Sequence, residues 1–232
     1  MIYVTGDTHI PHDIHKLDIN NFPQQKAMNK DDYVIICGDF GGIWNESKEE
    51  LYWRKWLKSR NFTTLFVDGN HENFDLLNSF PVEKWNGGKI HKINASIYHL
   101  MRGQVYTING LKLFTIGGAS SVDKENRIRS ISWWEEELPD YAQCEEGLNN
   151  LEKNNWQVDY IMTHTCPTTI LNKITEIFGF QPKPEDAVNK YLEVIEEKCK
   201  YNHWYFGHFH EDIEVDDKHT LVYEKIIRID NI

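Results

Sequence analysis

The sequence predicts a mixed-sheet α/β fold, because two patterns of secondary structure occur in different parts of the chain. Toward both ends, short apolar runs of strand type alternate with longer amphipathic helical segments, which is typical of parallel βαβ units. In the middle, short strands follow one another without intervening helices, which is typical of antiparallel pairing. The fold is therefore not expected to contain a purely parallel sheet.

The first part of the chain contains three predicted strands, at residues 2–5, 33–37 and 63–67. Each is a continuous apolar run, as expected for a strand that is covered on both faces. A helix is predicted between the second and third strands, at residues 47–60, because apolar side chains recur there at helical spacing among charged residues. These apolar residues are Tyr52, Trp53, Trp56 and Leu57.

The middle of the chain contains three successive predicted strands, at residues 96–100, 104–108 and 112–116. Asn109 and Gly110 separate the last two strands, and this dipeptide is a strong signal for a tight hairpin. These strands are therefore expected to pair in antiparallel fashion.

The last third of the chain returns to alternating helices and strands. Pro184 is expected in the first turn of the second helix, where its fixed φ and missing N–H are tolerated. The tail is expected to form a hairpin that turns near Asp216 and Asp217. The predicted elements are a helix at 141–154, a strand at 158–163, a helix at 184–198, a strand at 203–206 and the hairpin at 213–229.

Composition restricts the classes of protein that the chain can represent. It has 232 residues, of which 40% are hydrophobic and 13% aromatic, so one domain spanning residues 1–232 is expected. The formal net charge of −11 argues against a long nucleic-acid partner, because such binding depends on Lys and Arg neutralising phosphates. A small anionic substrate remains compatible with this charge if bound cations reverse it locally.

Cysteine usage and hydropathy indicate a cytoplasmic protein. The four cysteines, at positions 37, 144, 166 and 199, form no close pair, so reduced thiols are expected rather than disulfides or a zinc knuckle. The first residues show no signal-peptide pattern, and no apolar run is long enough for a membrane span. No membrane partner is therefore expected, and the sequence leaves the oligomeric state open.

Polar residues with metal-ligand chemistry follow five of the predicted strands. In open α/β sheets, ligand sites lie beyond the carboxyl ends of strands, so these groups are expected to converge. Carboxylates suit hard divalent ions, and imidazoles suit zinc, iron and similar ions. Each motif alone is more often a turn or a core histidine, and only their combination in this order is specific. The groups are Asp7 and His9, Asp39, Asn70 with His71 and Glu72, His164, and His208 with His210.

This order of motifs resembles that of the calcineurin-like metallophosphoesterases. The family pattern is Asp-x-His, Gly-Asp, Gly-Asn-His-Asp/Glu, a lone His and Gly-His-x-His, and the match runs from residue 6 to residue 210. The resemblance implies two mixed β-sheets packed as a sandwich and flanked by helices, in four α/β/β/α layers. It also implies a dinuclear metal centre, with manganese the first expectation and iron, zinc or nickel as alternatives.

The resemblance also assigns roles to individual residues. Asp39 bridges the two metals, and His71 lies beside the leaving group. Glu72 either orients His71 or has a surface or helix-capping role. The first metal is assigned to Asp7, His9 and His210, and the second to Asn70, His164 and His208. The implied reaction is hydrolysis of a small phosphorylated substrate, a phosphodiester or phosphomonoester with nucleotides among the candidates, by a metal-bridging hydroxide.

The sequence departs from the family pattern at Gly42. Many members carry an Asp at this position, often followed by an Arg that holds phosphate. Arg127 or Arg129 are candidate substitutes for that Arg, because an arginine fork matches phosphate geometry. Trp133 and Trp134 either cover a base or ring of the substrate or simply pack on the core.

Two other functions remain as alternatives. A non-catalytic scaffold could keep the fold, but it would be expected to lack ligands or His71, and all of these positions are filled. A dinuclear hydrolase of carboxylic esters or amides would be expected to show a denser His-x-His-x-Asp-His run, which the sequence does not contain.

Overall fold

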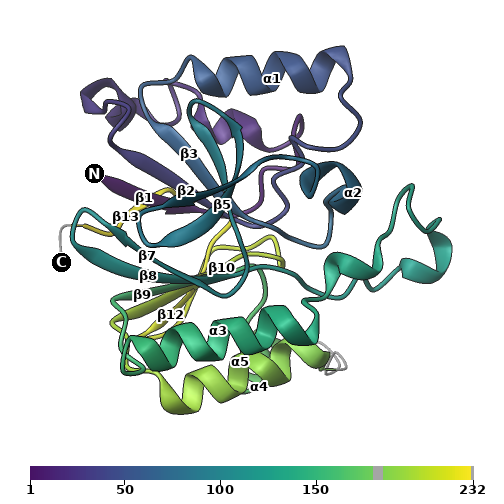
Figure 1. The fold of residues 1–232 in the computed structure, drawn as a ribbon, viewed down its shortest axis with the longest axis vertical. Coiled ribbons are helices and arrows are strands. Elements are labelled where there is room, and N and C mark those ends of the chain that lie inside the picture. Colours follow the sequence, from purple (N-terminus) through teal and green to yellow (C-terminus); the bar gives the residue numbers. More distant parts are fainter. Residues whose placement is uncertain (180–184, 231–232) are drawn as a thin grey trace.

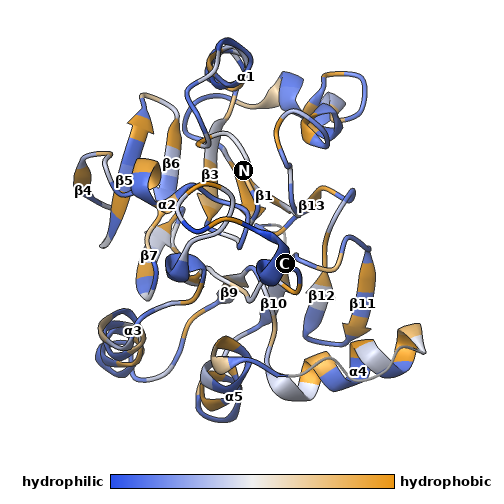
Figure 2. Ribbon diagram, turned by 90° about the vertical axis from the view of Figure 1, so that its right-hand side faces the viewer, coloured by the Kyte–Doolittle hydropathy of each residue, from blue (hydrophilic) through white to orange (hydrophobic). Residues whose placement is uncertain are grey.

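The computed structural model describes residues 1–179 and 185–230 as two mixed β-sheets with helices on their outer faces (Figure 1). One sheet has seven strands and the other has six. Helix α1 lies on one side of the two sheets, and helices α3, α4 and α5 lie on the other side (Figure 2). The four-layer arrangement expected from the sequence is therefore confirmed.

The first sheet has the strand order β13-β1-β2-β3-β6-β5-β4. Strands β1, β2, β3 and β6 are parallel, and the outer strands on both edges are antiparallel to their neighbours. The three strands predicted in the first part of the chain have the expected bounds. The strands are β1 (Ile2–Thr5), β2 (Tyr33–Cys37), β3 (Thr63–Val67), β4 (Val82–Trp85), β5 (Gly88–Asn94), β6 (Ile97–Leu100) and β13 (Ile227–Arg228).

The second sheet has the strand order β11-β12-β10-β9-β8-β7. Its β7–β8 hairpin turns at Asn109 and Gly110, whose φ angles of 51° and 84° are those that such a tight turn requires. This predicted hairpin is therefore confirmed. The strands are β7 (Gln104–Ile108), β8 (Leu111–Ile116), β9 (Tyr160–Thr163), β10 (His203–Phe206), β11 (Ile213–Asp216) and β12 (His219–Leu221).

Two predictions about strand pairing were wrong in detail. The strands predicted at 96–100 and 104–108 do not pair with each other, because β6 belongs to the first sheet and β7 to the second. The tail forms the predicted hairpin only as far as β12. Its last strand, β13, then crosses to the first sheet and pairs with β1. Strands β4 and β5 were not predicted, and β4 is mostly exposed, so it lacks an apolar signal.

The longer helices pack against the outer faces of the sheets. Helix α1 starts after Ser47, whose hydroxyl accepts the N–H of Glu50, so the predicted start is confirmed. Helix α4 was not predicted. Helix α5 begins after Asp186, which caps it, whereas Pro184 lies outside the described residues. The helices are α1 (Lys48–Lys58), α2 (Phe74–Leu77), α3 (Tyr141–Lys153), α4 (Thr168–Phe178) and α5 (Ala187–Lys198), with 3₁₀ turns at Ile14–Leu17, Pro23–Ala27, Lys124–Asn126 and Glu135–Glu137.

Three groups of buried apolar side chains fill the spaces between these layers. One lies between the two sheets and includes Val4, Leu65, Tyr106 and Met162. The other two lie between each sheet and its helices. All four cysteines are free, and Cys37 and Cys166 are fully buried, so the expectation of reduced thiols that pack as small hydrophobes agrees with the structure. Within the described residues, no helix is both long and apolar enough to span a bilayer.

A buried network of polar side chains begins on strands β5 and β6 of the first sheet. His91 and His99 are directly paired on β5 and β6, and their Nδ1 atoms are 3.0 Å apart. His99 Nε2 is 3.0 Å from the Asp68 carboxylate, which Arg102 also contacts. Burial alone would raise the pKa of Asp68, but the Arg102 charge and the His99 hydrogen bond outweigh it and hold this pKa below its usual range. His99 therefore donates Nε2–H to Asp68 and accepts the Nδ1–H of His91.

The hydrogen-bonded network of His91, His99 and Asp68 makes the free energy of unfolding depend on pH. Burial, and then the nearby His99, lower the pKa of His91 from 6.5 to about 4, so the folded state resists protonation that the unfolded chain accepts. The contribution of neutral His91 to the free energy of unfolding is thus present above pH 6.5 and is lost as the pH falls toward about 4. We expect His91→Gln, which keeps a donor toward His99, to flatten this loss in urea unfolding measured across the interval. The exposed control His15→Gln should follow the wild type, and equal slopes for His91→Gln and wild type would contradict the assignment.

Candidate metal centre

The five groups predicted from the strand ends come together where the two sheets meet. Asp7 follows β1, Asp39 follows β2 and Asn70 follows β3, all in the first sheet. His164 follows β9 and His208 follows β10, both in the second sheet. The cluster therefore combines side chains from both sheets, and neither sheet alone contains it.

The first part of the cluster consists of Asp7, His9, Asp39 and His210. One potential ligand atom from each of these residues lies within 4.8 Å of those of the others. His9 Nε2 is 3.2 Å from Asp39 Oδ2, and His210 Nε2 is 3.2 Å from Asp7 Oδ2. Two carboxylates and two imidazoles at this spacing form a donor set that suits a divalent transition metal.

The second part consists of Asn70, His164 and His208. His164 Nε2 is 3.1 Å from Asn70 Oδ1, and the His164 and His208 rings lie edge to face with centroids 4.9 Å apart. His164 and Asn70 are buried, whereas His208 is half-buried. An amide oxygen and two imidazoles again offer only oxygen and nitrogen donors.

Asp39 joins the two parts of the cluster. Its Oδ2 atom faces His9, and its Oδ1 atom is 3.5 Å from His164 Nε2. Oδ1 also accepts the backbone N–H of His71 at 2.7 Å. A carboxylate whose two oxygens face different imidazoles is placed to bridge two ions, so these residues fit a dinuclear centre.

Backbone geometry at the cluster is unusual. His9, Asp39, His208 and His210 all have positive φ angles, of 33°, 42°, 73° and 54°. Residues other than glycine seldom adopt this region, and they do so mainly where the surrounding structure enforces it, often at functional sites. Four of the seven predicted ligands are therefore held in place at a conformational cost.

Two glycines allow the ligands to approach one another. A Cβ at Gly38 would lie 2.0 Å from the His164 ring, and a Cβ at Gly69 would lie 1.9 Å from Asp39 Oδ1. Both distances are far shorter than any van der Waals contact. Glycine at these two positions is therefore required by packing against the ligands, in addition to the sharp turns that follow the strands.

Neighbouring groups orient the imidazoles. Asp13 Oδ2 is 2.8 Å from His9 Nδ1, and the Cys37 carbonyl is 2.9 Å from His164 Nδ1. Each leaves the opposite ring nitrogen, Nε2, directed into the cluster. Tyr223 stacks on His210 with ring centroids 5.0 Å apart. Asp13 was not predicted, although its position four residues after His9 is a signal that could have identified it.

The carboxylates control protonation within the cluster. Burial alone would lower the pKa of His9, but the hydrogen bond from Asp39 and the charges of Asp39 and Asp7 outweigh it and raise this pKa to about 9. Burial alone would raise the pKa of Asp39, but His164 and His9 hold it well below its usual range. The carboxylates therefore give the site a negative electrostatic potential, which favours the binding of cations.

A further chain of contacts orients Asn70. Its Nδ2 donates to Ser121 Oγ at 3.2 Å, and Ser121 in turn donates to Glu137 Oε2 at 2.6 Å. This contact directs the amide oxygen of Asn70 toward His164. Neither supporting residue was predicted, because Ser121 lies in a loop without a motif and Glu137 in a run of three glutamates.

Only one of the two candidate arginines reaches the cluster. Arg127 lies on the 117–135 segment and contacts both ring nitrogens of His71, with Nη1 2.9 Å from Nδ1 and Nη2 3.3 Å from Nε2. Arg129 instead pairs with Glu135, and both of these side chains are largely exposed. Burial lowers the pKa of His71, Asp39 opposes this effect and Arg127 adds to it.

The other predicted residues near the cluster have structural roles. Glu72 is fully buried and accepts the N–H of Phe40 at 2.7 Å, so its surface alternative was wrong. Burial raises the pKa of Glu72 well above its usual value, and the charge of Asp39 adds to this rise. A side chain at Gly42 would clash with the Phe40 ring, whose nearest atom is 2.5 Å from a Cβ at that position. The aspartate that many family members carry at this position could therefore not be accommodated here without repacking of Phe40.

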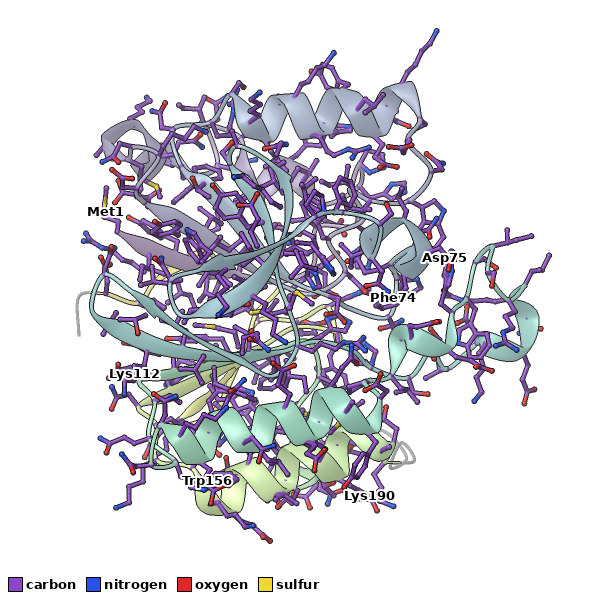
Figure 3. The ribbon with its side chains drawn as sticks, viewed as in Figure 1. Met1, Phe74, Asp75, Lys112, Trp156 and Lys190 are labelled. Carbon is purple, nitrogen blue, oxygen red and sulfur yellow. The ribbon has the colours of Figure 1, made fainter. Side chains whose placement is uncertain are left out.

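The two tryptophans of the 117–135 segment differ in burial, since Trp133 is half-buried and Trp134 is buried. Trp134 is 3% exposed and belongs to the core next to the first sheet, as the packing alternative predicts. Its Nε1 donates to Asp75 at 2.8 Å, and Figure 3 shows Asp75 where helix α2 meets this projecting segment. This contact attaches the segment to the domain on the side of α2.

A family model and a solved structure match this chain. The family model of the calcineurin-like phosphoesterases matches residues 1–212. A solved structure described as "Putative 5'-Nucleotidase from Staphylococcus aureus in complex with alpha-ketoglutarate" is similar, with 16% sequence identity and a TM-score of 0.47. The match covers 96% of this chain and 48% of that chain, so this chain spans about half its length. No curated protein matches the sequence significantly.

The contact between Gly69 and Asp39 leads to a test of the metal centre. We expect Gly69→Ala to bind less metal than the wild type, because its Cβ would lie against both Oδ1 and the backbone nitrogen of Asp39 and would displace this residue. Metal content of the purified, manganese-loaded protein measures the effect. Gly110→Ala is the control for a general loss of stability, since its φ of 84° strains an alanine there while the added Cβ meets nothing within 4 Å. Full metal content in Gly69→Ala would contradict a bridging position for Asp39.

Proposed function

The chain belongs to the calcineurin-like phosphoesterase family, and on this premise we propose that it hydrolyses a small phosphorylated substrate with two divalent ions bound. The substrate is a phosphodiester or a phosphomonoester, with nucleotides among the candidates. Manganese is the first expectation for the metals, and iron, zinc and nickel are the alternatives. The acidic net charge of −11 is compatible with this substrate because two ions would offset Asp7 and Asp39 locally.

One observation carries the proposal: the two oxygens of the Asp39 carboxylate face imidazoles from different sheets. Oδ2 is 3.2 Å from His9 Nε2, and Oδ1 is 3.5 Å from His164 Nε2. One ion would be held by Asp39 with Asp7, His9 and His210, and the other by Asp39 with Asn70, His164 and His208. When bound, two such ions lower the pKa of water and polarise phosphoryl oxygens.

The side chains of this chain then position the substrate and handle its protons. His71 lies beside the cluster, since its backbone N–H donates to Asp39 and its ring centroid is 5.9 Å from that of His9. The leaving oxygen of the ester needs a proton or a hydrogen-bond donor as its bond to phosphorus breaks. Burial lowers the pKa of His71, which makes its protonated ring a stronger acid and suits it to this transfer.

Arg127 supplies the positive side chain that the segment around Gly42 lacks. It contacts the His71 ring through both terminal nitrogens, and its Nε is 2.8 Å from Asp123. A guanidinium in this position can exchange these contacts for two hydrogen bonds to a phosphate group. Arg127 would therefore orient the phosphate beside His71.

A series of aryl phosphoesters with leaving groups of graded acidity tests the proposed reaction. Metal-loaded wild type should hydrolyse the series, and removal of metal by a chelator should abolish the activity. In His71→Ala, esters with poorly acidic leaving groups should slow about 100-fold or more, and esters with acidic leaving groups should slow much less.

Two outcomes would contradict the proposal in different ways. Absence of hydrolysis by the metal-loaded wild type, with every ester tested, would exclude the proposed function. Equal slowing of all esters in His71→Ala would keep the function but remove the proton-donor role of His71.

Arg127→Ala should raise KM for the same esters, because the phosphate loses a charge-assisted, two-point contact worth about 1.5–3 kcal/mol, or roughly tenfold to 100-fold in binding. Arg129→Ala is the matched control, since Arg129 lies on the same segment but pairs with exposed Glu135. Steady-state kinetics of both variants measure the difference. Equal kinetics for the two variants would show that Arg127 does not contact the substrate.

A further inference from the structure

A cavity of about 360 Å³ opens beside the metal cluster on the side of His71. His9 and His71 form its inner end, so it is continuous with the cluster. Its wall continues outward through Pro11 and Trp44 to the start of α1, at Ser47 and Glu49. We propose that this cavity binds the leaving group of the substrate and selects a ring-bearing alcohol that carries no negative charge. This inference rests on the proposed phosphoesterase function.

The position of the cavity matches the direction in which a leaving group must lie. His71 is the side chain assigned to the leaving oxygen, and it belongs both to the cluster and to the cavity wall. An alcohol bonded to phosphorus beside His71 would extend into this space. The cavity volume lies at the lower end of the range for small-molecule sites, which suits one ring system better than a larger ligand.

Trp44 provides a rigid flat surface in this cavity. Its ring lies edge to face against Trp134, with centroids 5.3 Å apart. Its backbone is held on both sides, because its N–H donates to Glu50 at 3.0 Å and its carbonyl accepts the Asn73 side chain at 2.7 Å. A tryptophan that is held in this way can contact a planar ring without losing conformational entropy on binding.

The charge of the cavity excludes anionic groups. Among the described residues that line it, none is Lys or Arg, whereas Glu49 and Glu50 both contribute. The Glu50 carboxylate is engaged by the backbone N–H groups of Trp44, Asn45 and Glu46, at 3.0, 2.8 and 3.1 Å, and by Arg54. Glu49 is exposed at the first turn of α1. At the outer end of the cavity, a leaving group with its own phosphate or carboxylate would therefore meet the Glu49 carboxylate and no Lys or Arg, whereas the positive charge of His9 lies at the inner end, beside the phosphate.

Three esters with one common phosphate group test this selectivity. They carry 4-chlorophenyl, 4-carboxyphenyl or trifluoroethyl leaving groups, and the two phenols have similar acidity. For the metal-loaded wild type we expect kcat/KM to be about tenfold higher for the chlorophenyl ester than for the carboxyphenyl ester, since like charge costs roughly 1.4 kcal/mol or more. Equal values for these two esters would overturn the charge selection.

Variants at two positions of the cavity wall separate ring recognition from charge. Trp44→Ala should lower kcat/KM for the chlorophenyl ester about tenfold relative to the trifluoroethyl ester, and Trp44→Phe should retain most of the wild-type ratio. The control Tyr52→Ala removes an aromatic ring on α1 that is 58% exposed and not part of the cavity, so it should leave the ratio unchanged. A ratio in Trp44→Ala equal to that in Tyr52→Ala would overturn ring binding.

Glu49→Lys tests the charge without disturbing the packed Trp44. We expect it to raise kcat/KM for the carboxyphenyl ester about fivefold or more relative to that for the trifluoroethyl ester. No gain for the carboxyphenyl ester would place the leaving group outside this cavity. Hydrolysis of all three esters without any preference overturns this inference alone, whereas no hydrolysis of any ester overturns the proposed function itself.

Discussion

The ionised carboxylate of Asp39, buried where the two sheets meet, is the group on which the rest of this site depends. A charge with 1% exposure is costly unless several partners compensate it, and here these partners come from both sheets. His9 faces one oxygen, while His164 and the backbone N–H of His71 face the other. The stacking of the two sheets is therefore inseparable from the geometry of the proposed metal centre.

The 117–135 segment supplies side chains that contact the residues at the strand ends. Ser121 connects Asn70 to Glu137, and Arg127 reaches His71, while Trp134 attaches the segment to the core and to Asp75. His71 also lines the cavity together with Trp44, where the backbone N–H groups of Trp44, Asn45 and Glu46 all donate to Glu50. His71 thus contacts Arg127, which suits a phosphate, and lines the cavity of Trp44 and Glu49, which suits an uncharged ring.

Local signals in the sequence were sufficient where one short segment decides the outcome. The apolar runs of β1, β2 and β3 had the expected bounds, and the Asn109–Gly110 hairpin formed as predicted, because both depend on neighbouring residues only. Local signals did not predict the features that depend on segments far apart in the sequence. The mostly exposed strand β4 has no apolar pattern, and nothing local indicates that β6 and β7 belong to different sheets or that β13 pairs with β1.

The sequence by itself predicted that the seven proposed ligands and His71 come together, because each lies in a short motif that follows a strand. The tertiary structure alone decided which groups support them. Asp13 on His9, Ser121 and Glu137 behind Asn70, and Arg127 rather than Arg129 beside His71 follow from where the backbone brings separate segments together. The reason is physical: a ligand is selected by its own donor atom, whereas its orientation and the shape of the adjoining cavity depend on packing between residues that are far apart in the chain.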